Sequence, residues 1–128
     1  MVVDASAILA ILLNEPDADD FKYALADAQV RYISPVNWFE VAIRAESASK
    51  IDYEAFDDLM KKLSINVVPV DAAHMCLAHK AWLKFGKGRD KAKLNLGDCF
   101  AYALAKSLNE PLLYKGRDFT LTDIQSVL

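Results

Sequence analysis

Short segments rich in Val, Ile and Leu recur along the chain, separated by longer segments with helical periodicity. The four apolar segments are residues 1–4, 30–33, 65–70 and 111–114. They lack the alternation of apolar and polar residues that is typical of a sheet with one face in solvent. Strands of this kind, alternating with helices, predict a parallel sheet covered by helices on both faces. The 128 residues therefore predict one α/β domain with a short, mostly parallel central sheet.

Residues that favour helix starts support this division of the chain. We expect Pro16 in the first turn of the second helix, where its missing N–H is not needed. Ser34 is a suitable N-cap ahead of Pro35, and Asp52 and Asp71 are suitable N-caps for later helices. The predicted helices cover residues 5–15, 16–28, 34–50, 52–63 and 71–85, and a last one begins at Leu96.

Composition narrows the class of protein. Hydrophobic residues make up 54% of the chain, which predicts a solid core with apolar surface left for a partner. A net charge of −3 argues against coating nucleic acid through bulk charge, although a local basic patch is compatible with it. The longest apolar run, residues 7–13, is far shorter than a membrane span of about 20 residues. It also lacks the basic leader of a signal peptide.

The two cysteines, Cys76 and Cys99, lie in apolar helical patterns without a CxxC motif. This pattern predicts buried, reduced thiols and a cytoplasmic location.

Acidic residues stand where strands end. Asp4 closes the first apolar segment, and Asp118 comes shortly after the last one. In parallel α/β sheets, reactive groups gather beyond the carboxyl ends of the strands. Glu40 and Asp98 lie on predicted helices that can face the same edge. The pattern predicts that these four carboxylates converge.

Three of these acids also have an ordinary structural interpretation. Asp4 could cap the first helix, and Asp118 could be a turn residue. Asp98 follows a good N-cap, Asn95, by three residues and could complement the helix dipole.

A structural interpretation fits Glu40 less well. A helical wheel places it with Phe39 and Ile43 on the face that we expect to point at the core. The other side of this helix is apolar as well, through Trp38, Val41, Ala42 and Ala45. Such a helix is either sandwiched in the core or supplies a contact surface.

Four ionised carboxylates in one place would repel one another. At about 5 Å and an effective dielectric constant near 20, each neighbouring pair repels by roughly 3 kcal/mol. Protons or a cation must compensate, and ligation by oxygen alone suits Mg²⁺ or Mn²⁺. His74 and His79 are interpreted as ordinary helix residues, because their spacing does not align them as zinc ligands. Hydrolysis of a phosphodiester is the favoured chemistry, since no phosphate loop or nucleophile elbow competes.

A basic segment directly precedes Asp98. It contains Lys84, Lys87, Arg89, Lys91 and Lys93 together with two glycines. A solvated run of charge is the simpler interpretation. Beside an acidic metal site, the same residues could hold the phosphates on either side of a scissile bond.

Four segments taken in order resemble the PIN-domain ribonucleases, specifically the VapC toxins of bacterial VapBC toxin–antitoxin modules. They are VVDASAILAILLNE, SPVNWFEV, LNLGDCFAYALAK and YKGRDFTLTDI, and they span essentially the whole chain. The resemblance implies a PIN-like three-layer α/β/α sandwich, with residues 1–128 as a single PIN domain. It also implies an Mg²⁺- or Mn²⁺-dependent endoribonuclease that leaves a 5′-phosphate and a 3′-hydroxyl.

By the same resemblance, the acidic quartet is Asp4, Glu40, Asp98 and Asp118. Asp4 and Asp98 would be the principal metal ligands. Glu40 and Asp118 would complete the site and orient the attacking water. The basic residues Lys87, Arg89, Lys91 and Lys93 would contact RNA.

Three further residues fit the resemblance in part. Ser6 matches a small hydroxyl residue that would support the ligands by a hydrogen bond, or it could be an ordinary first-turn residue. Asp123 matches a frequent additional acid, and a helix cap is equally compatible with it. Arg117, where many relatives carry another residue type, could pair with Asp118 or touch RNA.

The resemblance implies a homodimer and a cognate VapB-type antitoxin whose tail blocks the acidic site. DNA would be bound only through the antitoxin, and no membrane contact is expected. One alternative is a PIN-fold nuclease that processes RNA or acts on structured DNA outside such a module. Another is a non-catalytic module that binds RNA or protein. Small size favours the toxin, and the complete quartet argues against a non-catalytic module.

Overall fold

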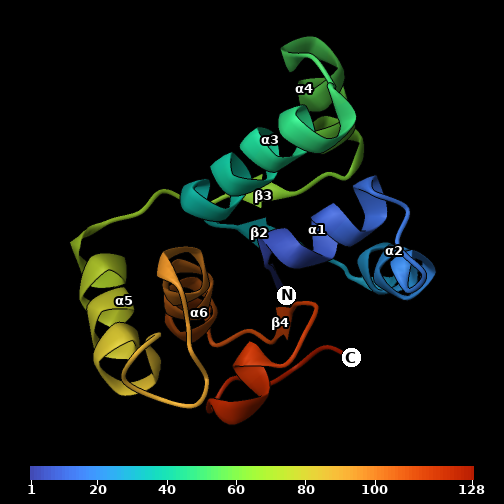
Figure 1. The fold of residues 1–128 in the computed structure, drawn as a ribbon. Coiled ribbons are helices and arrows are strands. Elements are labelled where there is room, and N and C mark those ends of the chain that lie inside the picture. Colours follow the sequence, from blue (N-terminus) through green and yellow to red (C-terminus); the bar gives the residue numbers. More distant parts are fainter.

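The computed structural model describes residues 1–128 and contains one four-stranded sheet. The strands are β1 (Val2–Val3), β2 (Tyr32–Ile33), β3 (Asn66–Val67) and β4 (Leu112–Leu113). All neighbouring pairs are parallel, in the order β3-β2-β1-β4, so β1 is central. The predicted parallel sheet is confirmed, although each strand is shorter than the apolar segment that contains it (Figure 1).

Helices connect the strands and supply the outer layers. They are α1 (Ala5–Leu12), α2 (Ala18–Asp27), α3 (Pro35–Ser49), α4 (Tyr53–Lys62), α5 (Ala72–Phe85), α6 (Leu96–Leu108) and the 3₁₀ helix η1 (Asp118–Leu121). None of them combines the length and the apolar composition that crossing a membrane requires.

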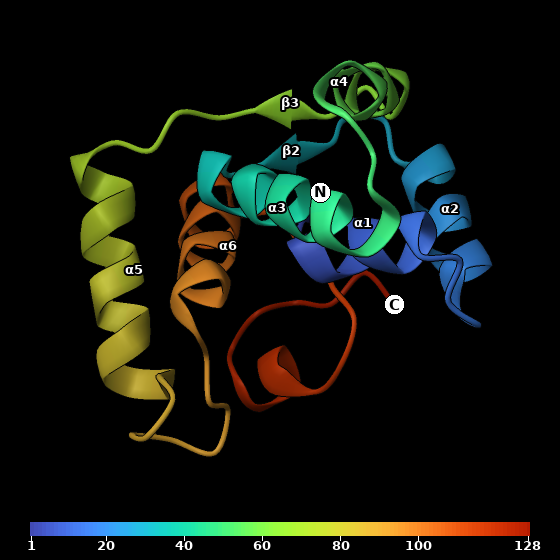
Figure 2. The ribbon, with the colours of Figure 1, turned by 45° about the horizontal axis from the view of Figure 1, so that its top comes forward.

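Alternate strand residues divide the core between the two faces of the sheet. Val3, Ile33 and Leu113 pack with residues of α1 to α4 in one cluster. Val2 and Leu112 pack with residues of α5, α6 and η1 in the other. Figure 2 shows α5 and α6 on one side of the strands and α1 and α2 on the other. The three-layer sandwich predicted by the resemblance is therefore confirmed.

Most predicted helix starts are observed. The side chains of Ser34, Asp52 and Asp71 each accept a backbone N–H from the first turn of α3, α4 and α5. Pro16 is the exception, because it lies outside α2, which begins at Ala18. The Ala18 N–H instead donates to the Glu15 carbonyl at 2.9 Å, closing a turn. Pro16 is the second residue of that turn, a position that its fixed φ suits.

The prediction for β3 was wrong in extent and burial. Residues 65–70 were expected to form a buried strand, but only Asn66 and Val67 pair with β2, and both are exposed. β3 is the edge of the sheet, so it has a neighbour on one side only. The prediction that helices cover both faces of the sheet is therefore correct for β1, Ile33 and β4, and it is wrong for β3.

The orientation predicted for the Glu40 helix was also wrong in part. α3 buries Asn37, Val41 and Ala45, whereas Phe39 is 64% exposed and Ile43 45% exposed. The face expected to point at the core is thus partly a surface, and Glu40 lies half-buried at its border.

The predicted burial of the cysteines holds only for one of them. Cys99 is buried and Cys76 is exposed, and both are free thiols.

Candidate active site

Asp4 sits where β1 ends and α1 begins. Its backbone N–H donates to the Leu113 carbonyl at 2.9 Å, which ties this point to the end of β4. Its Oδ2 accepts the Ser6 backbone N–H at 3.0 Å and the Ser6 hydroxyl at 2.5 Å. Asp4 is therefore the N-cap of α1, as its structural interpretation predicted. It is also only 3% exposed, and burial raises its pKa, while the bonds from Ser6 oppose that rise.

Ser6 links the two ends of the sequence at this point. Its hydroxyl donates to Asp4 and accepts the backbone N–H of Lys115 at 2.9 Å. The segment that follows β4 is thereby held beside the start of α1. The expected supporting hydrogen bond is present in the structure.

Asn37 is a member of the site that the sequence analysis missed. It is fully buried, and its Nδ2 lies 3.3 Å from Asp4 Oδ1 and 3.0 Å from the Gly97 carbonyl, to both of which it donates. Its Oδ1 has no hydrogen-bond partner. The sequence did contain a signal for Asn37: it is four residues before Val41 and eight before Ala45, so it lies on the same buried face of the helix. A polar side chain on a buried face needs hydrogen-bond partners, and this marks it as a candidate site residue.

Glu40 reaches from α3 to the first turn of α6. A Cβ placed on Gly97 would lie 2.4 Å from Glu40 Oε2, so this carboxylate occupies the space beside the glycine. Burial raises the pKa of Glu40, and the charge of Asp4 adds to the rise, whereas Arg44 opposes it. The charge of Asp4 therefore reaches Glu40, although the two residues come from different parts of the fold.

Asp98 belongs to a capping box at the start of α6. Its backbone N–H donates to Asn95 Oδ1, and its Oδ2 accepts the Asn95 N–H, both at 2.9 Å. Burial raises the pKa of Asp98 to about 7, and the charges of Asp4, Asp118 and Glu40 add to the rise. The helix-terminus role that was one interpretation of Asp98 is therefore real, and it coexists with a place among the other acids.

Asp118 is the first residue of η1 and is exposed. The next residue, Phe119, is buried, and its ring lies 4.9 Å from that of Tyr114, which follows β4. This contact anchors η1 under the site. The charge of Asp118 raises the pKa of both Asp4 and Asp98, so it lies within electrostatic reach of each.

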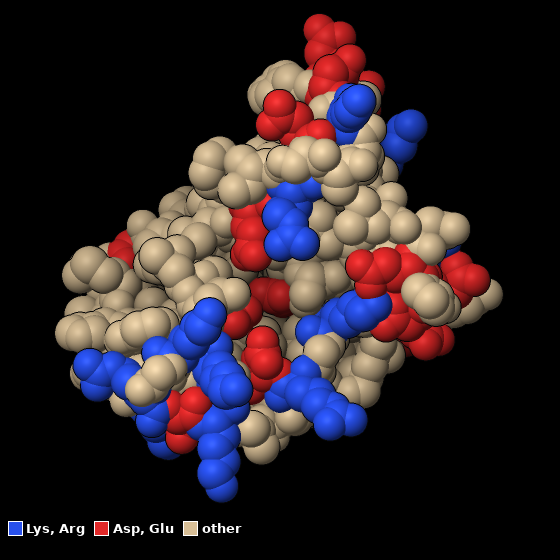
Figure 3. Space-filling view, in the orientation of Figure 1, with Lys and Arg blue, Asp and Glu red and all other residues tan.

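The four acids thus come from separate stretches of the chain, and the charges of Asp4, Glu40 and Asp118 each reach Asp98. Figure 3 shows carboxylates in a hollow near the centre of this face, with basic side chains around it. No three His, Cys, Asp or Glu side chains lie close enough, as placed, to hold one metal ion. Repulsion between ionised carboxylates opposes closer approach without a cation.

The donor set fits a hard divalent cation. It consists of carboxylate oxygens, with the unpartnered amide oxygen of Asn37 nearby. Histidine is not part of it, because His74 Nε2 lies 3.0 Å from Ser107 Oγ and His79 is exposed. Oxygen donors without histidine or thiolate suit Mg²⁺ or Mn²⁺ better than zinc.

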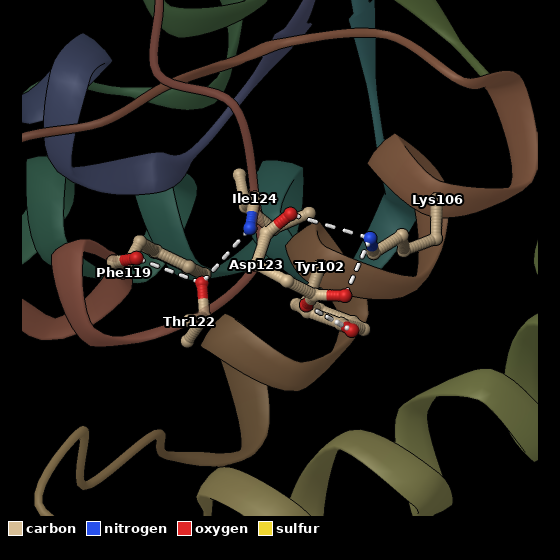
Figure 4. Close-up of polar contacts among 6 residues, drawn as sticks. All are labelled: Tyr102, Lys106, Phe119, Thr122, Asp123 and Ile124. Atoms are coloured by element: carbon tan, nitrogen blue, oxygen red, sulfur yellow. Dashed lines mark hydrogen bonds and ion pairs between the residues drawn. The ribbon is translucent and has the colours of Figure 1, made fainter.

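Asp123 has partners other than those expected. Its carboxylate accepts the Tyr102 hydroxyl at 2.7 Å and pairs with Lys106 Nζ at 2.8 Å (Figure 4). Lys106 lowers the pKa of Asp123. Asp123 caps no helix and forms no hydrogen bond with any of the four acids. Asp123 thereby fastens the segment after η1 to α6. Within that segment, Thr122 Oγ1 accepts the N–H of Ile124.

The basic loop, residues 86–95, joins α5 to α6 and ends just before Asp98. Backbone bonds from Lys87 to Leu94 and from Leu94 to Phe85, both 2.9 Å, close its base. Ala92 and Leu94 are buried beneath it. The side chains of Lys87, Arg89, Lys91 and Lys93 are exposed and belong to no ion pair within the chain.

This combination of a parallel three-layer sandwich and an acidic group beyond the strand ends coincides with a family match. A family model described as "PIN domain" matches residues 1–125. The fold also resembles a solved chain of a toxin–antitoxin complex from Klebsiella pneumoniae. The TM-score is 0.71 at 18% identity, covering 95% of this chain and 92% of that one.

Curated relatives narrow the family further. A "Ribonuclease VapC" of Mycolicibacterium smegmatis is 44% identical over 128 residues, which is 99% of each chain. A VapC ribonuclease of Mycobacterium tuberculosis is 42% identical over 130 residues, covering 100% of this chain and 98% of the relative. The chain belongs to the PIN-domain family and, within it, to the VapC ribonucleases.

Proposed function

We propose that this protein is a metal-dependent endoribonuclease and the toxin of a toxin–antitoxin module. The observation that carries the proposal is that residues from the end of β1, from α3 and from the start of α6 meet at one place. Asn37 joins Asp4 to the Gly97 carbonyl, Glu40 lies against Gly97, and the next residue is Asp98. The charges of Asp4, Glu40 and Asp118 each raise the pKa of Asp98. Membership of the VapC ribonucleases supports RNA as the substrate.

Each acid has a role in the proposed reaction. Asp4 and Asp98 hold Mg²⁺ or Mn²⁺, and Glu40 and Asp118 complete the site and orient the attacking water. When bound, the cation supplies a water of lowered pKa and shields a phosphoryl oxygen. Asp98 must lose its proton to serve as a ligand, and its pKa of about 7 makes that step sensitive to pH near neutrality. The products carry a 5′-phosphate and a 3′-hydroxyl.

The basic loop holds the substrate beside these acids. Lys87, Arg89, Lys91 and Lys93 are free of intramolecular ion pairs and are available to phosphate oxygens. Arg117 is exposed next to Asp118 and is a further candidate for phosphate contact.

The proposed partners are a VapB-type antitoxin and a second copy of the chain in a homodimer. The fold shared with a chain of a solved toxin–antitoxin complex supports the antitoxin. Exposed Phe39 and Ile43 on α3 supply apolar surface for a protein contact. DNA binding belongs to the antitoxin. Two free thiols accord with a cytoplasmic location.

An RNA cleavage assay tests the proposal. Wild type is expected to cut RNA with Mg²⁺ or Mn²⁺ and to stop with EDTA. Asp98→Asn is expected to lose about 100-fold or more in rate, because a neutral amide is a poor ligand for a hard cation. Asp58→Asn, which removes an exposed carboxylate on α4, is the matched control and should keep full activity.

Two outcomes would favour the alternatives. Binding of RNA without cleavage would identify a non-catalytic module. Cleavage without growth arrest on expression would identify a nuclease outside a toxin–antitoxin module. Growth arrest that disappears with Asp4→Asn would support the toxin. Cleavage that is unaffected by EDTA would exclude the proposed chemistry.

A further inference from the structure

Lys115, the second residue after β4, pairs with two carboxylates on the turn that joins α1 to α2. Its Nζ donates to Asp17 Oδ1 at 2.7 Å and also to Glu15 Oε2. All three side chains are half-buried. The mechanism proposed above uses none of them.

The turn between α1 and α2 is itself fixed. The Glu15 N–H donates to the Ala10 carbonyl of α1 at 2.9 Å, and the Ala18 N–H donates to the Glu15 carbonyl at the same distance. Glu15 and Asp17 therefore present their carboxylates from a turn that is bonded to both helices, which makes it a defined anchor for Lys115.

The main chain of Lys115 is tied near the other end of α1. Its N–H donates to the Ser6 hydroxyl at 2.9 Å, and that hydroxyl donates to Asp4. Ser6 lies in the first turn of α1, whereas Glu15 and Asp17 come after the helix has ended. One residue thus contacts α1 near its start and the turn beyond its end.

Few other contacts hold the segment that leads from Lys115 to Asp118. The backbone N–H groups of residues 116–118 form no hydrogen bond within the chain. Gly116 has a φ of +100°, which glycine adopts without strain, so nothing in this residue restricts the backbone. The buried ring of Phe119 anchors the far side of Asp118. The near side depends on Lys115.

We propose that Lys115 is a positioning residue of the candidate active site. By holding the turn after α1, its side chain fixes the segment that carries Asp118. It also keeps in place the backbone N–H that supports Ser6 and, through Ser6, Asp4. The inference rests on the proposed ribonuclease function and deepens it with a residue that acts on two of the four acids.

A contact with RNA is the competing role for a lysine close to the acids. Hydrogen bonds to Asp17 and Glu15 raise the pKa of the Lys115 amine, and the same pairing lowers the pKa of Asp17. The lysines of the basic loop, by contrast, belong to no ion pair within the chain. A phosphate would have to displace two carboxylates from Lys115, so positioning is the role that its contacts favour.

These ion pairs act through geometry more than through stability. Pairs that remain partly exposed contribute little to the free energy of unfolding, because water and salt screen them. A displacement of about 1 Å at a reacting group, however, can slow a reaction by roughly 100-fold. Loss of the Lys115 amine is therefore expected to slow cleavage while the melting temperature changes little.

The first experiment compares Lys115→Met with Lys115→Arg in the RNA cleavage assay. Methionine keeps an unbranched stem and the backbone N–H but removes the charge, whereas arginine keeps a cation that can bridge two carboxylates. Lys115→Met should lower kcat roughly 10- to 100-fold with an unchanged KM for RNA, and Lys115→Arg should recover most of the loss. Lys22→Met removes an exposed ion pair with Asp19 on α2 and is the matched control, which should cleave like wild type.

Removing the two partners in place of the lysine separates positioning from RNA binding. The double variant Glu15→Gln, Asp17→Asn leaves Lys115 intact and unpaired. It should slow cleavage as much as Lys115→Met does, and adding Lys115→Met to it should cost no further activity. A lysine that binds RNA would instead keep or gain activity when its acidic partners are removed.

Binding of Mn²⁺ to the RNA-free protein gives a readout that does not depend on cleavage. Lys115→Met should weaken Mn²⁺ binding roughly 10-fold in titration calorimetry, because groups that orient metal ligands typically contribute about 10- to 100-fold to affinity. Lys115→Arg should bind Mn²⁺ nearly as well as wild type. Thermal melting of the metal-free proteins checks that each variant is folded.

Three results would overturn the inference. One is a raised KM of Lys115→Met at unchanged kcat, which would assign Lys115 to RNA binding. Another is an equal loss in Lys115→Met and Lys22→Met. The third is full activity of the variant that lacks both acidic partners. If wild type cuts RNA and binds Mn²⁺ while any of these holds, the proposed function stands and the positioning role does not. A wild type that neither cuts RNA nor binds Mn²⁺ would exclude the proposed function, and the inference with it.

Discussion

Gly97 is small because the Glu40 carboxylate occupies the space beside it. Replacing Gly97 with Ala puts a methyl group 2.4 Å from Glu40 Oε2, so the flexible end of Glu40 must move. We expect Gly97→Ala to lower the rate of RNA cleavage about 10-fold or more. Stability should hold or rise slightly, because Ala is favoured over Gly in a helix by roughly 1 kcal/mol. Cleavage rates and thermal melting of the same preparation measure the two effects.

A double mutant isolates the cause of that loss. In a Glu40→Ala background, the methyl group of Gly97→Ala meets no carboxylate, and the second substitution should cost no further activity. Full additivity of the two losses would mean that Gly97→Ala acts by another route.

Single residues were predictable where they interrupted an apolar pattern. Asp4 and Asp98 stand out in the sequence for this reason, and the structure gives both the capping roles that were their alternatives. Asn37 was missed because the helical wheel of α3 was aligned on Glu40, which placed Phe39 and Ile43 inside. The burial of an amide depends on which neighbour supplies its partners, here Asp4 and the Gly97 carbonyl, and these are far away in the sequence.

At the scale of elements, η1 is held by contacts that are not part of the acidic group. Asp123 fixes the segment after η1 to α6 through Tyr102 and Lys106. We expect Asp123→Ala to lower stability by roughly 0.5–1.5 kcal/mol and to slow cleavage, because Asp118 at the start of η1 loses its fixed position. Amide hydrogen exchange of residues 115–124 should become faster, because the free energy needed to open this segment falls by about the same amount.

Asp57→Ala is the matched control for that change. It removes an ion pair of similar length, 2.6 Å to Lys61, from α4. Cleavage should be unaffected. Equal slowing by both substitutions would mean that Asp123 acts through general stability and not through η1.

Elements were predictable where local chemistry decides them. Ser34, Asp52 and Asp71 cap helices by bonds within one turn, and these starts were correct. Strand extent was overestimated because an apolar segment forms a strand only where a neighbouring strand lies beside it. Residues 65–70 have one only beside Asn66 and Val67. Pro16 was misplaced because a turn and a first helical turn demand the same φ of proline.

At the scale of the whole molecule, carboxylate burial makes stability depend on pH. The folded-state pKa of Asp98 is raised to about 7 from an ordinary 3.8, and those of Asp4 and Glu40 are raised as well. Between about pH 4 and pH 7 the folded state binds more protons than the unfolded state, so stability falls as pH rises and levels off above pH 7. Acids with lowered pKa values, such as Asp71, act only below this window.

Without divalent ions, we therefore expect a lower melting temperature at pH 8 than at pH 5. Mg²⁺ or Mn²⁺ should raise it at pH 8 and do little at pH 5, where protons already neutralise the carboxylates. Asp98→Asn should flatten much of the pH dependence in scanning calorimetry. A metal-free protein equally stable at both pH values would contradict a buried acidic group.

The central position of β1 has a consequence for synthesis. β1 pairs with β4, and Asp118 follows β4. Both β4 and the last of the four acids are therefore made late in translation. A nascent chain stalled before Leu112 carries Asp4, Glu40 and Asp98 without the strand that fixes Asp4. Such ribosome-bound chains should leave RNA intact, and release of the longer product should start cleavage.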